Sequence, residues 1–284
     1  MPPDMAPDAA VEARTPPAAA EAKGRRPVPF RGGTFRPRAI PFAAPLVFLV
    51  LIGLWELGSR SGLISPIALP APSEAIAAMG DLIETGMLWR HLEASLSRLV
   101  MGWTIGTVAG IVLGLAIGLF SLARAGLSPV VSALFPIPKI ALLPLFIIWF
   151  GIGEGSKVAT IVFGTFFPTV IATYGGVDSV DRTLIRMGQS FALSPLSIVR
   201  KIILPGALPA ILSGARISAS IAIILLVAAE MIGAEYGIGA YILLAGSLFA
   251  LDQLIAGVAM LSIIGLTVAW LIGRAERALL DWRT

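Results

Sequence analysis

Few residues of this chain could do chemistry, because the sequence is 57% hydrophobic and only 13% charged. It has no cysteine and one histidine, His91, which excludes a thiolate metal site and argues against histidine-based catalysis. We expect His91 to be a surface residue. The glycine-rich segment 151–157 lacks the Gly-Lys-Ser/Thr of a phosphate-binding loop, so a tight turn between two helices is the better interpretation.

The ionisable side chains of Lys139 and Glu230 fall inside apolar stretches. A lysine at the centre of a membrane helix costs about 2.5–3.5 kcal/mol, so its ammonium must face a partner or water. Pro136, Pro138 and Pro144 flank Lys139 and remove backbone hydrogen bonds, which predicts a kinked helix. Broken helices at membrane depth are typical of solute pathways. We therefore predict that these five residues line a translocation path; a structural ion pair or carbonyl contact is the alternative.

Long apolar stretches must position these residues. The mean hydropathy of the 284 residues is +0.90, and soluble domains carry about 25% charged residues. Apolar stretches cover residues 41–58, 99–120, 129–150, 157–175, 215–234 and 253–273. Each is about 27–33 Å long as a helix, enough to cross the hydrocarbon core of a bilayer. Because only helices satisfy their backbone there, we predict an all-α integral membrane fold with six transmembrane helices.

The basic residues orient this fold. With the N-terminus in the cytoplasm, sixteen of the 21 lysines and arginines lie on the cytoplasmic side. Seven of the sixteen belong to residues 1–38, which are predicted to form a disordered basic tail. The other nine follow the second, fourth and last apolar stretches. The positive-inside rule therefore places both termini in the cytoplasm. This topology explains the pI near 9.8 without a nucleic-acid partner.

One long cytoplasmic loop, 176–213, joins the fourth and fifth stretches. An apolar stripe at helical spacing predicts an amphipathic helix there, formed by Val180, Leu184, Met187 and Phe191. Ser194 and Pro195 predict the cap and first position of a second short helix that continues into the fifth stretch. We interpret this helix–turn–helix as a docking site for a cytoplasmic partner. A helix lying on the lipid surface is the alternative.

The loop ends in an Ile-x-Leu-Pro motif at Ile202, Leu204 and Pro205. It resembles the coupling segment of bacterial binding-protein-dependent ABC importer permeases, where Glu-Ala-Ala, three residues, Gly and nine residues precede that motif. The Glu-Ala-Ala and Gly positions here hold Arg186, Met187, Gly188 and Ala192. The resemblance implies contact with an ATPase, without the usual Glu. The predicted coupling residues are Leu184, Arg186, Met187, Gly188, Phe191, Ala192, Ile202, Leu204 and Pro205.

Other motifs resemble the nitrate/sulfonate/taurine branch of that family, in matching order over about residues 40–284. They are Leu69-Pro70-Ala71-Pro72-Ser73, Ser95-Leu96-Ser97-Arg98, residues 136–145, residues 149–153, Ala229-Glu230-Met231, Gly237-Ile238-Gly239, Glu276-Arg277 and Trp282-Arg283. The resemblance implies a permease domain over 39–284 in the bacterial inner membrane. It would carry a small anionic solute such as nitrate, a sulfonate or taurine.

The resemblance also implies partners: cytoplasmic ATP-binding subunits, a periplasmic solute-binding protein and a second permease, which forms a homodimer or a pseudo-dimer with this chain. No cofactor is expected on this chain, and ATP and Mg belong to the partner ATPase. Lys139 would attract the anion only weakly, because tight binding would slow its release.

Two other classes of protein are alternatives to an importer permease. An ion-coupled secondary transporter needs intramembrane carboxylates, for which Glu230 and Asp252 are the candidates. A membrane-embedded enzyme needs a cluster of His, Asp, Glu or Ser at one depth, and the sequence shows none.

The topology can be tested directly because the chain has no native cysteine. Cysteine introduced at Ser73 or Glu154 should react with a membrane-impermeant thiol reagent added to intact cells. Cysteine at Ser190 should react only after permeabilisation. The reverse labelling pattern would invert the predicted orientation.

Overall fold

The computed structural model describes residues 42–65 and 67–281, and within these residues all regular structure is helical. The predicted tail and the Trp282-Arg283 motif lie outside the described residues. The chain divides into two units, Met1–Val50 and Leu51–Thr284, of which the first contributes the beginning of α1. The helices are α1 (Ala43–Arg60), α2 (Pro72–Glu84), α3 (Met87–Leu119), α4 (Ser121–Leu134), η1 (Lys139–Leu142), α5 (Leu143–Phe150), α6 (Glu154–Asp178), α7 (Arg182–Ser190), α8 (Pro195–Ile198), η2 (Val199–Ile203), α9 (Leu204–Glu230), α10 (Ile238–Ser247) and α11 (Leu251–Leu280).

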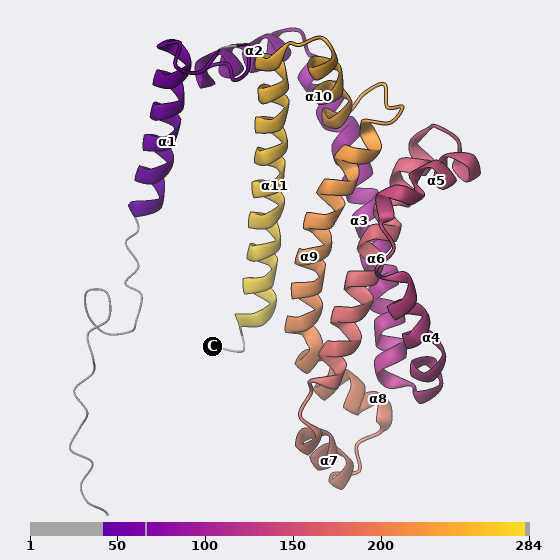
Figure 1. The fold of residues 1–284 in the computed structure, drawn as a ribbon. Helices are drawn as coiled ribbons and strands as arrows, with labels where there is room; N and C mark the ends of the chain where they lie inside the picture. The colour runs from indigo at the N-terminus through magenta and orange to yellow at the C-terminus, as the bar shows by residue number, and fades with distance from the viewer. Residues whose placement is uncertain (1–41, 66, 282–284) are drawn as a thin grey trace, which may run out of the picture. The chain divides into compact units, whose positions relative to one another are not determined.

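Five helices of the described chain are long and apolar enough to cross a membrane, and a bent pair makes a sixth candidate. The all-α fold with six spans is confirmed in this form. In the second unit, α3, α6 and α9 lie side by side, with α7 and α8 beyond one end and α10 beyond the other (Figure 1).

The sequence predicts one kinked helix for the third span, whereas the structure breaks this span into two separate helical segments. It consists of α4 and the η1–α5 segment, which are bent by 91° at a break between Leu134 and Lys139. Pro136 and Pro138 lie in this break, because their nitrogens cannot donate backbone hydrogen bonds. Pro144, predicted to be a kink, instead lies in the first turn of α5, where a missing N–H is tolerated.

The second span is longer than predicted, and the fifth span continues the short helix predicted at Pro195. α3 begins at Met87 rather than 99, and the helix of the fifth span runs without a break from Pro195 to Glu230. The predicted apolar stretch begins only after Arg98, whereas the structure places Arg98 inside α3 and buries its side chain. The short helices α2 and α10 were not predicted.

The α3 and α6 helices approach closely through glycine. Five glycines of α3 at four-residue spacing face α6: Gly102, Gly106, Gly110, Gly114 and Gly118. A Cβ at any of them would come within 2.0–2.8 Å of an α6 atom. The facing residues rise in step, from Ile161 opposite Gly102 to Val177 opposite Gly118, so the two helices run parallel. Small residues at this spacing let helix backbones pack closely in lipid.

The buried face of α6 carries hydroxyls that are satisfied within the helix. Thr160, Thr165 and Thr169 are fully buried, and each donates to the carbonyl four residues earlier, at 2.8, 2.9 and 2.8 Å. Three of these threonines therefore face the glycines with their hydroxyls paired. Thr173, buried opposite Gly114, is the exception among the described residues, because its Oγ1 has no hydrogen-bond partner. On its other side α6 packs antiparallel on α9, where Gly164 faces Leu225 and Gly176 faces Ala210.

The motif at residues 69–73 joins the end of α1 to the start of α2. Trp55 Nε1 donates to the Pro70 carbonyl at 3.0 Å, and Ser59 Oγ donates to the Leu69 carbonyl at 3.1 Å. The Glu56 carboxylate accepts from the Ser73 amide at 3.1 Å and from its hydroxyl at 2.8 Å. Side chains of α1 thus hold the motif through the carbonyls of Leu69 and Pro70 and through Ser73.

The α3–α6 packing predicts a sharp difference between two glycines. Gly106→Ala should lower the free energy of unfolding by about 1–3 kcal/mol, because its Cβ would lie 2.0 Å from Thr165 Oγ1 and 2.6 Å from the Val162 carbonyl. Gly126→Ala in α4, with no atom within 4 Å, should be neutral or stabilise by about 0.5–1 kcal/mol. Denaturation in mixed detergent micelles measures both. Equal effects would contradict the close approach of α3 and α6.

Candidate functional site

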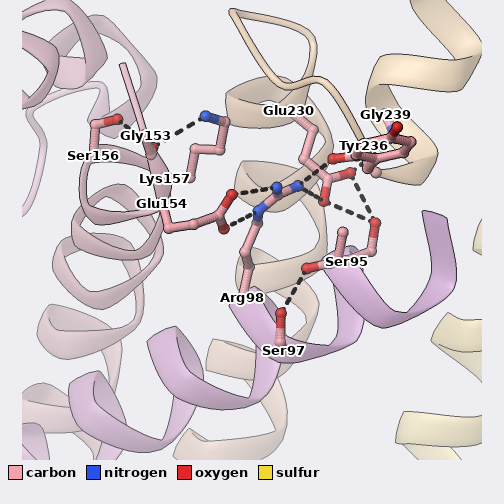
Figure 2. Close-up of polar contacts among 12 residues, drawn as sticks. Ser95, Ser97, Arg98, Gly153, Glu154, Ser156, Lys157, Glu230, Tyr236 and Gly239 are labelled. Carbon is pink, nitrogen blue, oxygen red and sulfur yellow. Dashed lines mark hydrogen bonds and ion pairs between the residues drawn. The ribbon is translucent and has the colours of Figure 1, made fainter. Parts of the chain in front are cut away.

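A buried arginine joins three helices at one end of the bundle (Figure 2). Arg98 of α3 is only 4% exposed. Its Nη1 donates to Glu230 Oε1 at 2.8 Å and to the Tyr236 carbonyl at 2.7 Å. Its Nε and Nη2 donate to the two carboxylate oxygens of Glu154, at 2.5 and 2.6 Å. One guanidinium therefore links α3, the first turn of α6 and the last residue of α9.

Glu230 is the enclosed partner, and its side chain is 0% exposed. Besides Arg98, it accepts from Ser95 Oγ at 2.8 and 3.0 Å and from the Gly239 amide at 2.9 Å. A buried carboxylate is tolerated when it is paired and its oxygens are hydrogen-bonded, as here. Glu230 therefore acts as a structural anchor in this arrangement, which was the stated alternative to a place in the path.

The same cluster caps α10. The first N–H groups of a helix have no intrahelical acceptor. Here three consecutive amides donate to side chains: Gly237 to His91 Nδ1 at 3.1 Å, Ile238 to Ser95 Oγ at 2.9 Å, and Gly239 to Glu230. His91, Ser95 and Arg98 lie on one face of α3. The start of α10 is thus fixed by residues more than 130 positions earlier in the chain.

Gly237 must be glycine. Its φ is +143°, and a Cβ there would lie 2.5 Å from Glu230 Cδ and 2.8 Å from Arg98 Nη1. L-residues avoid this backbone region, and no side chain fits beside the ion pair. The Gly-x-Gly motif therefore exists to bring the α10 backbone against the buried carboxylate.

A second buried cation lies beside the cluster. Lys157 of α6 is 2% exposed, and its Nζ donates to the carbonyls of Ile152, Gly153 and Gly233 at 2.7, 3.1 and 3.3 Å. It holds the turn before α6 against the loop that follows α9. The interpretation of 151–157 as a tight turn is consistent with this arrangement.

Two expectations about this end of the molecule were wrong or incomplete. His91 is not a surface residue: it is 5% exposed and packs between Tyr236 and Tyr241, with ring centroids 5.9 and 5.4 Å away. The Arg98–Glu230 pair was missed, because opposite charges 132 residues apart in a sequence give no pairing signal. The available signal was that both belong to motifs at the ends of apolar stretches.

Two cavities adjoin the Arg98–Glu154 pair. A polar one of about 400 Å³ is lined by Arg90, Glu93, Ala94, Ser97, Arg98, Glu154 and Tyr236. A more apolar one of about 590 Å³ runs between α3, α5 and α6, and Met101, Phe146 and Phe163 are among its lining residues. Ser97, Arg98 and Glu154 line both cavities. In the described part of the chain, no group of three or more His, Cys, Asp or Glu is placed to hold a metal.

Lys139 lies elsewhere, at the start of η1 after the helix break. Its Nζ donates to the Phe135 carbonyl and lies 4.9 and 5.5 Å from the ring centroids of Phe135 and Phe167. No carboxylate pairs with it among the ion pairs of the described residues. Its ammonium is thus held by a carbonyl and two aromatic faces, a weak arrangement.

The α7–α8 segment exposes apolar side chains at the opposite end. The exposed fractions of Leu184, Met187, Phe191 and Leu196 are 46, 51, 74 and 76%. Val180, predicted to belong to the same stripe, is instead buried, because it lies before α7 and packs in a cluster with Val177, Ala207 and Ile211. The Thr183 amide donates to the Asp181 carboxylate at 2.7 Å and holds its pKa below the usual value. The stripe that remains on α7 faces away from the rest of the chain.

The turn between α7 and α8 is a Schellman motif. The Leu193 amide donates to the Gly188 carbonyl at 3.1 Å, and the Ala192 amide donates to the Gln189 carbonyl at 2.9 Å. Ala192 occupies the left-handed position, with φ +52°. Glycine normally fills that position because it has no Cβ, and the family pattern has Gly there. Ser194 caps α8 by accepting from the Ser197 amide, as predicted.

The remaining predicted coupling residues fall on two sides of this segment. Arg186 is exposed on α7, whereas Gly188 is buried and a Cβ there would lie 2.9 Å from Ile202 Cδ1. Ile202 belongs to the π-helical turn η2 and packs against a cluster of Val177, Val180, Ala207 and Ile211. Leu204 and Pro205 begin α9 directly after it. The segment is therefore continuous with α9 and joined to the bundle through Ile202.

These features define a polytopic membrane permease: several apolar helices, a broken span and one amphipathic segment turned away from the bundle. Residues 106–281 match the family model described as binding-protein-dependent transport system inner membrane component, and the chain belongs to this family. It is therefore a transport subunit of an ABC importer rather than an enzyme, and ATPase activity resides in a separate subunit. Membership implies ATP-binding and solute-binding partners. Nothing favours the ion-coupled alternative.

Curated relatives are similar over most of their length. The taurine transport system permease TauC of Escherichia coli (strain K12) is 37% identical over 82% of this chain and 86% of its own. SsuC of Bacillus subtilis (strain 168), a permease named for aliphatic sulfonates, is 34% identical over 82% and 85%. The fold resembles a chain of the MetNI methionine ABC transporter in an inward-facing conformation. That likeness has a TM-score of 0.59 and 23% identity, and it covers 68% of this chain and 96% of the other.

The cluster predicts that the two carboxylates on Arg98 differ in importance. Glu230→Gln should lower the free energy of unfolding by about 3–5 kcal/mol, because it removes one partner of a fully buried pair. Glu154→Gln, at a carboxylate whose side chain is 64% exposed, should cost about 0–1 kcal/mol. Detergent denaturation of the two purified variants makes the comparison. A larger loss for Glu154→Gln would contradict the assigned roles.

The Schellman turn predicts a stabilising substitution. Ala192→Gly should stabilise the α7–α8 turn by about 1 kcal/mol, because a left-handed residue with a Cβ costs about 1–2 kcal/mol. Hydrogen exchange of the 182–198 amides measures the local effect. Ala207→Gly, at a fully buried residue of α9 with ordinary helical geometry, is the control and should destabilise. Faster exchange in the Ala192→Gly variant would show that the left-handed backbone of Ala192 is not strained.

Proposed function

We propose that this chain forms the translocation path of an importer for small organic sulfonates such as taurine. The single observation that carries this substrate class is its similarity to TauC and SsuC over more than four-fifths of the chain. The paired cation Arg98 and the weakly held cation Lys139 suit an anionic group on the solute.

We further propose that α7 and α8 dock the ATP-binding subunit. The exposed Leu184, Met187 and Phe191 form an apolar face that fits a hydrophobic groove on a partner. Arg182 and Arg186 flank it, so the partner surface should carry acidic residues near the groove. ATP and Mg would be bound by that subunit, with no cofactor on this chain. Because α8 continues into α9, a movement of the docked subunit would pass directly into the bundle.

The orientation follows from this assignment. With α7 and α8 in the cytoplasm, both termini are cytoplasmic in a bacterial inner membrane. The Arg98 cluster and α10 then face the periplasm, where a solute-binding protein would deliver substrate. A second copy of the permease would complete the path as a homodimer, with residues 39–284 as the permease domain. Lys139, with Pro136 and Pro138 at the break and Pro144 after it, is proposed to border that path.

The proposal is tested by reconstituting the permease with its ATPase and binding protein in proteoliposomes. Wild-type protein should import labelled taurine when ATP is supplied. Leu184→Asp combined with Phe191→Asp should remain inserted but lose the ATPase on purification and lose uptake, because the apolar face becomes charged.

Gln189→Asp is the matched control, since it adds a charge at an exposed polar position of the same helix and should retain both. Retained co-purification and uptake in the double variant would show that α7 does not dock the ATPase. An absence of sulfonate uptake by the wild type would reject the substrate class.

A further inference from the structure

The two carboxylates on Arg98 are held very differently. Glu230 is fully enclosed and accepts hydrogen bonds from three residues. The Glu154 side chain is 64% exposed, and its carboxylate accepts hydrogen bonds from Arg98. An exposed partner exchanges easily with solvent or another anion, because its pairing is worth little. The guanidinium would remain anchored if Glu154 left, since Nη1 stays bonded to Glu230 and Tyr236.

The edge of the Arg98 guanidinium that Glu154 occupies has the geometry of an oxyanion-binding site. Nε and Nη2 of Arg98 donate to two oxygens of one group, the bidentate geometry that arginine offers to planar or tetrahedral oxyanions. Without Glu154, the immediate cluster holds two cations, Arg98 and Lys157, against one carboxylate, Glu230. That net positive charge favours an incoming anion.

The position of this edge also fits a solute path. Ser97, Arg98 and Glu154 line both the polar cavity of about 400 Å³ and the more apolar cavity of about 590 Å³. A solute with an anionic head and a short apolar body would find both environments beside the same guanidinium.

We propose that Arg98 is an oxyanion-binding site for the solute, and that Glu154 occupies it as an internal competitor until the solute's anionic group displaces it. That this anionic group is a sulfonate rests on the proposed function. The competitor keeps affinity moderate, which a transport site requires if its ligand is to leave. Glu230 is the positioning residue that keeps the Arg98 guanidinium in place.

A cysteine-protection experiment on the detergent-purified permease tests this site without transport. Ser97→Cys provides the sole thiol, on the wall of both cavities. Its labelling by a neutral maleimide is measured against rising methanesulfonate, with methanesulfonamide as the uncharged analogue. The concentration for half-protection is compared among the parent, Glu154→Gln and Glu93→Gln. Glu93 lines the same polar cavity but makes no ion pair with Arg98, so it controls for general charge.

We expect Glu154→Gln to lower the half-protecting methanesulfonate concentration by about threefold to tenfold, because the competing carboxylate is gone. Glu93→Gln should change it by less than about twofold, and methanesulfonamide should not protect. Equal shifts in the two variants, protection by the uncharged analogue, or no protection at all would overturn the site. If the expected pattern appears but the reconstituted importer does not take up sulfonates, the site stands and the proposed substrate class falls.

Discussion

The burial of one guanidinium, that of Arg98, constrains the whole end of the bundle around it. An enclosed charge requires an opposite charge and satisfied donors, and both come from far along the chain. Glu230 supplies the charge and Tyr236 supplies a carbonyl, so α9 must end beside the N-terminal third of α3. The same carboxylate accepts from the start of α10, which leaves room only for glycine at Gly237. One ion pair thereby determines where α9 ends and α10 begins.

Close helix approach makes this pairing possible. The α3 glycines bring its backbone against α6, and the small residues of α6 and α9 do the same on the other side. In lipid, where burial of apolar surface gives little drive, such close packing is what holds helices together. The first turn of α6, which carries Glu154 and Lys157, therefore lies within hydrogen-bond reach of the Arg98 cluster.

The two ends of the second unit differ in how their polar and apolar groups are satisfied. At the Arg98 end, the buried Arg98 and Glu230 form an ion pair, the buried Lys157 donates to carbonyls, and Glu154 is the exposed partner of Arg98. At the α7–α8 end, apolar side chains are exposed, while Ile202 and Gly188 hold the segment to the bundle. A subunit with a fixed polar cluster at one end and an open apolar face at the other suits transfer of motion between solute and ATPase sites.

The sequence alone was enough to predict the class of fold and the amphipathic helix in the 176–213 loop. Apolar length predicts spans, and helical spacing predicts the Leu184–Met187–Phe191 face, because both depend on neighbours in the chain. The Ser194 cap was predictable for the same local reason. Tertiary structure alone decided the burial of His91, the Arg98–Glu230 pair and the role of Gly237, since each depends on a contact more than 130 residues away. It also decided the length of α3, because whether a charge ends a span depends on whether a distant carboxylate neutralises it.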